Sequence, residues 1–144
     1  MGVIHKCIGD WAAQPLWSGS RQRGYESDEA RGVKETWLIG KAEGAKNHAL
    51  RYYEVEPHGF SREESHEHDH GIIILHGEGE VQLEDETVAV EAGDVIYIPP
   101  NERHQLRNRG EALLGFFCII PAVRTKGDKS VWAEERFTDL TIVD

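Results

Sequence analysis

The chain has 144 residues, of which 39% are hydrophobic and 29% are charged, and its formal net charge is −10 at pH 7. A chain of this length folds as one domain, and this composition excludes both disorder and membrane embedding. The acidic charge excludes nucleic acid and anionic membranes as expected partners. No apolar run reaches the ~18 residues that span a bilayer, and no signal-peptide core follows Met1, so we expect a cytoplasmic protein.

The two cysteines, Cys7 and Cys118, are far apart in the sequence. In a reducing compartment we expect no structural disulfide between them. Cys118 lies in the apolar run at residues 113–120, where a cysteine either packs as a small hydrophobic residue or serves as a nucleophile. Both interpretations stay open, and Cys7 receives no role.

The first predicted segment, residues 1–30, is an arm without regular periodicity. It carries Trp11 and Trp17, and a stretch rich in glycine, serine and arginine at residues 18–24. We expect the arm to pack its tryptophans on the body of the protein or on a partner subunit. Because the edge strands of a small barrel need cover, we also expect a homodimer.

From Val33 onward, short β-prone runs alternate with turn signals. The predicted strands cover residues 36–39, 49–55, 72–75, 80–83, 87–90, 95–98, 104–108 and 113–120. About eight strands with closely spaced turns are typical of an all-β sandwich or barrel. We place the barrel at residues 31–121 and a C-terminal extension at residues 122–144, in which residues 128–140 favour a short helix.

Histidines occupy every second position just before the apolar run at residues 72–75. These histidines are His66, His68 and His70. Glu64 precedes them with the same spacing, and side chains two apart on an extended chain share a face. Neutral imidazoles beside a carboxylate suit a first-row divalent metal, and His104 offers a further ligand after the turn at residues 99–101. Manganese or ferrous iron suits this mixed nitrogen and oxygen set, and zinc or nickel are alternatives.

Two motifs of the chain resemble those of the cupin superfamily. The first cupin motif has a glycine, spaced histidines and a closing glycine, which stand here as Gly59, His66, His70 and Gly77. The second has glycine, aspartate, an apolar run and proline, then histidine and asparagine, which stand here as residues 93–99, His104 and Asn108. The resemblance implies an all-β double-stranded β-helix, the cupin jelly-roll barrel.

The four-histidine manganese cupins are one similar branch of this superfamily. Their ligand positions correspond to Glu64, His66, His70 and His104, so a glutamate replaces the first histidine. The resemblance implies one divalent metal ion per chain at these four residues. Glu64 is either a ligand or an acid that orients a ligating histidine. His68 falls in the connection between strands and is either a ligand or a neighbour of the ligands.

The methylsulfurylase cupins are a second similar branch. The chain shares their Glu-x-His-x-His-x-His-Gly string at residues 64–71 and their Gly-Phe-x-Cys exit at residues 115–118. This branch moves a methylthio group from 1-methylthioxylulose 5-phosphate to a thiol. The resemblance therefore implies a metal-dependent enzyme with Cys118 as its nucleophile, and a sugar phosphate and a thiol as its small-molecule partners.

Two other functions fit the same metal ligands. A metal-dependent dioxygenase would need the histidines but no cysteine, and a non-catalytic cupin would bind a small molecule without turnover. Five arginines are available for an anionic substrate group, namely Arg21, Arg23, Arg51, Arg103 and Arg107. Nothing in the sequence selects among them. His76 precedes a turn, and we expect it to be partly exposed.

Overall fold

The computed structural model describes residues 2–122 and 140–144. Within these residues the chain forms β-strands and one short 3-10 helix, η1 (Lys41–Glu43). The strands are β1 (Arg21–Tyr25), β2 (Arg31–Ile39), β3 (His48–Phe60), β4 (His70–His76), β5 (Glu78–Leu83), β6 (Glu86–Glu91), β7 (Val95–Ile98), β8 (His104–Asn108), β9 (Leu114–Pro121) and β10 (Thr141–Ile142). In the described parts of the chain, no helix is long and apolar enough to cross a membrane.

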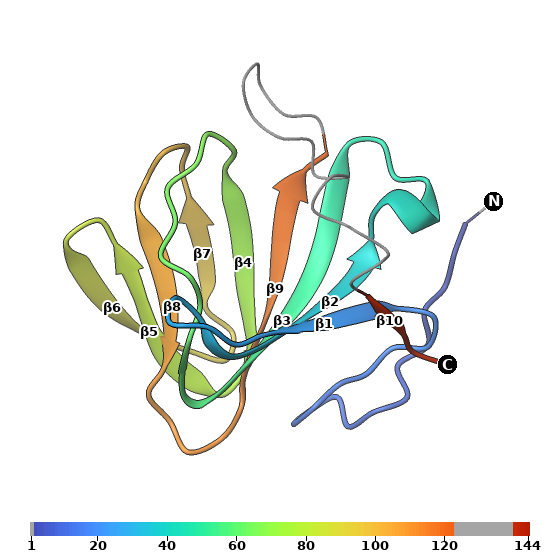
Figure 1. Cartoon of the computed structure of the whole chain (residues 1–144), viewed down its shortest axis with the longest axis horizontal. Coiled ribbons are helices and arrows are strands. Elements are labelled where there is room, and N and C mark those ends of the chain that lie inside the picture. Colours follow the sequence, from blue (N-terminus) through green and yellow to red (C-terminus); the bar gives the residue numbers. More distant parts are fainter. Residues whose placement is uncertain (1, 123–139) are drawn as a thin grey trace.

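The strands pair antiparallel in one branched sheet. One path runs in the order β10-β1-β2-β3-β8-β5-β6, and a branch leads from β3 through β9 and β4 to β7. Figure 1 shows the strands curving around a common interior, with β5, β6 and β8 at one end and β1, β2 and β10 at the other. The predicted all-β jelly-roll barrel is confirmed. Each of the eight predicted strands overlaps an observed one.

Alternate side chains of the apolar strands fill the interior. Along β9, every second side chain is buried, and these are Leu114, Phe116, Cys118 and Ile120. Along β4, the same alternation buries His70, Ile72 and Ile74. Both strands therefore follow the period of two that places one face inward. Cys118 shares its inward face with Phe116 and Ile120, as the sequence predicts.

The sheet extends beyond residues 31–121. Strand β1 comes from the predicted arm and pairs with β2, and β10 pairs with the other edge of β1. The sequence of β1 shows no apolar alternation because two side chains on one of its faces are charged: Arg21 binds Glu43, and Arg23 binds the buried carboxylate of Glu35. The helix predicted at residues 128–140 lies outside the described residues, except for residue 140.

His76 is buried, which corrects the expectation that it is partly exposed. Its Nε2 lies 2.7 Å from the hydroxyl of Tyr52, and its Nδ1 lies 3.3 Å from the carbonyl oxygen of Leu113. Both ring nitrogens thus have partners inside the protein. This is why a strand-end histidine can be withdrawn from solvent here.

The N-terminal segment covers the outer face of the sheet. Trp17 is 7% exposed, and its ring packs against the rings of Tyr52 and Phe117 at centroid distances of 5.1 and 5.9 Å. Trp11 contacts the rings of Trp17 and Phe117 but is 53% exposed. Of the two predicted packing sites, the body of the same chain is therefore the observed one.

Replacing the two tryptophans separately tests this cover. We expect Trp17→Ala to lower the free energy of unfolding by about 3–5 kcal/mol because it removes a buried indole. Trp11→Ala, the matched control, should lower it by about 1 kcal/mol or less, since much of that ring is in solvent. Urea denaturation measures both values. Equal losses would contradict the packing of Trp17 on the sheet.

Candidate metal centre and thiol

Three histidines from separate segments converge at one end of the barrel. His70 begins β4, His104 begins β8, and His66 lies in the connection that precedes β4. One ligand atom of each lies within 4.8 Å of those of the other two. The Nε2 atoms of His66 and His70 are 2.7 Å apart. The structure thus brings together three of the four predicted ligands.

The backbone orients two of these rings. The Nδ1 atom of His66 lies 2.8 Å from the carbonyl oxygen of His68, and that of His104 lies 2.8 Å from the carbonyl oxygen of Glu102. A carbonyl oxygen only accepts, so Nδ1 carries the proton in both rings and Nε2 keeps its lone pair. This is the arrangement in which a histidine ligates a metal, and the donor set fits a divalent ion.

Burial keeps the inner histidines neutral. It lowers the pKa of His70, and the positive charge of Arg51 lowers it further. Burial also lowers the pKa of His104. The hydrogen bond to the carbonyl of Glu102 acts to raise this pKa, but the net shift is downward. Neutral imidazole is the form that binds a metal, so both rings are ready as ligands at neutral pH.

The carboxylate of Glu64 faces the same centre from its rim. Burial acts to raise the pKa of Glu64, but its interactions with the neighbouring histidines and Arg51 outweigh it, and the net shift is downward. Its Oε2 lies 3.5 Å from Nε2 of His66, and its side chain is 44% exposed. A backbone bridge between Glu64 and His104 fixes its place. Glu64 therefore approaches the histidines without belonging to the tight cluster.

His68 supports the centre through its neighbour. Its ring stacks on that of His66 at a centroid distance of 3.7 Å and an angle of 2°. It is buried, yet it contributes no atom to the cluster of three histidines. Of the two roles predicted for His68, this position agrees with that of a neighbour of the ligands.

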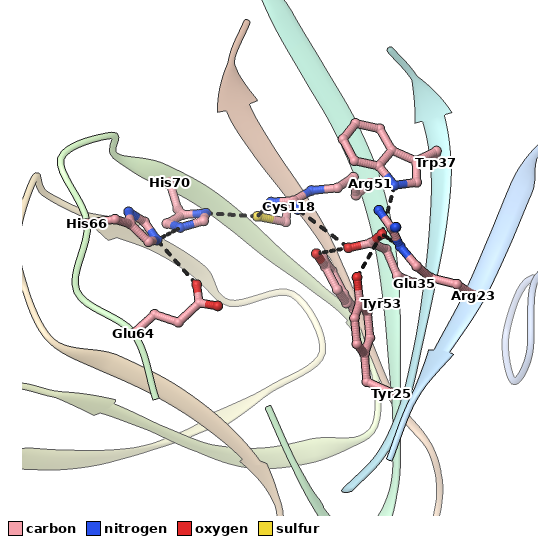
Figure 2. Close-up of polar contacts among 10 residues, drawn as sticks. All are labelled: Arg23, Tyr25, Glu35, Trp37, Arg51, Tyr53, Glu64, His66, His70 and Cys118. Carbon is pink, nitrogen blue, oxygen red and sulfur yellow. Dashed lines mark hydrogen bonds and ion pairs between the residues drawn. The ribbon is translucent and has the colours of Figure 1, made fainter. Parts of the chain in front are cut away.

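Cys118 lies directly behind one of the histidines. Its Sγ is 3.0 Å from Nδ1 of His70 and 3.7 Å from Nη2 of Arg51, and the residue is 3% exposed. Burial raises the pKa of its thiol, and the charge and hydrogen bond of Arg51 act against that rise. Figure 2 shows the sulfur between the histidine cluster and Arg51.

One cavity of about 480 Å³ joins these groups, within the size range of small-molecule sites. His70, His104 and Cys118 line it from the side of the metal centre. Of the five arginines considered from the sequence, Arg23 and Arg51 line the cavity. Arg62, which the sequence did not single out, lines it too and pairs with Glu29 at 3.3 Å.

Sequence reasoning also missed the buried carboxylate of Glu35. It lies on β2 in the cavity wall, is 2% exposed, and accepts hydrogen bonds from side chains of three strands. These donors are Arg23, Tyr25, Trp37, Arg51 and Tyr53, as Figure 2 shows. The only sequence signal was an acid just before the strand predicted at residues 36–39, which an exposed position would equally explain.

Comparisons with known proteins agree with this geometry. The family described as "Cupin domain" matches residues 51–120. Among curated proteins, the 1-methylthio-D-xylulose 5-phosphate methylsulfurylase of Rhodospirillum rubrum is 42% identical over 77 residues. These residues are 54% of this chain and 49% of that protein, so the match spans about half the length of the relative.

Solved structures extend the likeness over more of the chain. A cupin-2 domain protein from Rhodospirillum rubrum is 32% identical with a TM-score of 0.72, over 83% of this chain and 80% of that one. The polyketide cyclase RemF from Streptomyces resistomycificus is 27% identical with a TM-score of 0.67, over 74% and 76% of the two chains. The chain therefore belongs to the cupin family.

Proposed function

We propose that this protein is a metal-dependent cupin enzyme that transfers a methylthio group from a small polar substrate to a thiol. The specific substrate proposed is 1-methylthioxylulose 5-phosphate. The observation that carries the proposal is the position of Cys118, whose sulfur lies 3.0 Å from His70 in the wall of the cavity. The partial match to a methylsulfurylase supports the same chemistry.

The proposed metal ligands are His66, His70 and His104, with Glu64 as the fourth. The nitrogen and oxygen donors suit manganese or ferrous iron, and zinc or nickel would also bind. A divalent ion bound there would act as a Lewis acid toward a substrate oxygen. The histidines would hold it at the end of the cavity that Cys118 also lines.

Cys118 would act as the nucleophile. Its sulfur attacks the methylthio sulfur, an S–S bond forms, and the bond from that sulfur to the sugar carbon breaks. The electron pair goes to the carbon, where the adjacent ketone stabilises it, and the carbon then takes up a proton from water. A second thiolate attacks the methylthio sulfur, releasing a methyl disulfide and restoring the thiolate of Cys118.

The charges around Cys118 favour this role. Since burial raises the pKa of its thiol, the reaction needs a nearby positive charge, and Arg51 supplies one at 3.7 Å. Arg62 has a half-exposed side chain and lines the same cavity, so it can meet an anionic substituent such as a phosphate. The cavity thus offers Cys118 and Arg51 for the methylthio group of the proposed substrate and Arg62 for its phosphate.

Alanine substitutions test the metal centre. His66→Ala or His104→Ala should abolish stoichiometric metal binding, because each removes one of three converging nitrogens. His68→Ala, the matched control, should retain most of the metal, since the backbone oxygen of residue 68 that binds His66 is kept. Metal analysis of the purified variants measures this. Equal losses in His66→Ala and His68→Ala would show that the ligand set is wrong.

Serine substitution tests the nucleophile. Cys118→Ser should keep the fold and the metal content but lose turnover, because a serine hydroxyl stays protonated at neutral pH. Without an acceptor thiol, wild-type protein incubated with the substrate should gain one methylthio group on Cys118, detected by mass spectrometry. A fully active Cys118→Ser variant would reject thiol transfer. A metal-dependent dioxygenase and a non-catalytic small-molecule binder would then remain.

We further propose a homodimer, formed through the outer face of β4, β7 and β9. Tyr97 and Ile119 both pair with Gly71 across β4, and Val95 lies in the next row. These three apolar side chains are 62%, 41% and 74% exposed. Such a contiguous apolar row is typical of an interface.

Light scattering tests the dimer. The wild-type chain should give a species of twice 16.3 kDa at micromolar concentration. Val95→Lys should shift it toward monomer, while Val88→Lys, at an exposed valine on β6, should not. A clean monomer of the wild-type chain would contradict the proposal.

A further inference from the structure

The carboxylate of Glu35 binds the groups that surround Arg51. Its Oε1 accepts hydrogen bonds from Trp37 Nε1 and Arg23 Nε, each at 2.7 Å. Its Oε2 accepts one from the hydroxyl of Tyr53 at 2.5 Å and faces Nη1 of Arg51 at 3.5 Å. Both oxygens are therefore used by donors from the neighbouring strands.

The aromatic rings that hold Arg51 are the same ones that bind Glu35. The guanidinium carbon of Arg51 lies 5.4 Å from the ring centroid of Trp37 and 5.2 Å from that of Tyr53. Contacts of this kind orient a guanidinium over the face of a ring. Since the polar atoms of both rings donate to Glu35, one carboxylate fixes the rings and the cation together.

The guanidinium of Arg51 bridges Glu35 and the thiol. Its Nη1 faces the carboxylate, and its Nη2 faces Sγ of Cys118 at 3.7 Å. The sulfur contacts His70 as well, so it is held from both directions (Figure 2). A buried cation moves when its counter-ion is removed, because an unpaired charge is costly inside a protein.

We propose that Glu35 is a positioning residue for Cys118: it holds Arg51 so that Nη2 stays beside the sulfur that takes up the methylthio group. The inference rests on the proposed function, in which that sulfur is the nucleophile. Glu35 itself touches neither the thiol nor the substrate. Its effect passes through the guanidinium of Arg51.

Charge and position predict opposite results when Glu35 is neutralised. Glu35 is negatively charged and lies behind Arg51, so its charge opposes a negative charge on the sulfur of Cys118. Loss of that charge alone would make the thiol react faster. Loss of the positioning of Arg51 makes it react more slowly, since the sulfur loses its charged donor. The sign of the change therefore separates the two effects.

The test measures how fast methyl methanethiosulfonate transfers its methylthio group to Cys118 at neutral pH. The sulfur displaces methanesulfinate and keeps the methylthio group as a mixed disulfide, so neither substrate nor metal is needed. Peptide mass spectrometry separates Cys118 from Cys7, which is exposed and serves as the internal reference. Glu35→Gln should slow modification of Cys118 about tenfold, the effect of losing one charged hydrogen bond.

Glu54→Gln is the matched control. Glu54 is also a buried carboxylate, but it binds Tyr52 and Gln14 on the outer face of the sheet. Its loss should lower stability without changing the rate at Cys118. If Glu35→Gln does not fold, Glu35→Asp keeps the charge but shortens the reach to Arg51, and it should also slow the reaction.

An unchanged or faster rate at Cys118 in a folded Glu35 variant would overturn the proposal. Steady-state kinetics give a second readout, in which Glu35→Gln lowers kcat more than it changes KM. If wild-type protein transfers no methylthio group from the sugar phosphate, the proposed function fails. The reagent assay still decides the positioning role, because it requires no turnover.

Discussion

The rest of the structure depends on the burial of β3 on both faces. Arg51 and Tyr53 reach the cavity on one face, while Tyr52 and Glu54 lie under the N-terminal segment on the other. A strand covered in this way cannot leave its charged side chains in water, so each needs a partner inside the protein. Glu35 meets this need on the inner face. The constraint explains why this wall of the barrel carries so many polar side chains.

The two ends of the cavity use different kinds of basic residue for a physical reason. A metal binds neutral imidazole, and burial keeps His70 in that state by lowering its pKa. A thiolate needs a positive charge beside it, which a neutral histidine cannot supply. Arginine stays protonated in a buried site, so Arg51 can keep its charge close to the neutral ring. In the proposed site, metal binding and stabilisation of the thiolate would thus fall to different side chains.

The sequence predicted the barrel and the histidine cluster because both follow simple periodicities. Apolar alternation located the strands, and two cupin motifs located His66, His70 and His104. Strand β1 escaped prediction because burial of a charged side chain leaves no apolar pattern. Glu35 escaped for a related reason: its five donors come from three strands, and spacing along one strand cannot reveal such a meeting.

The connection between β3 and β4 has a consequence for how such a site can diversify. Glu64, His66 and His68 lie in this connection, outside the named strands, whereas Arg51 and Cys118 lie in register with each other inside the sheet. Substitutions in the connection change the donors offered to an ion without disturbing a single ladder of the barrel. Those at the paired strand positions disturb packing as well. The preference of the proposed centre for one ion over another could therefore change without disturbing the thiol and its arginine.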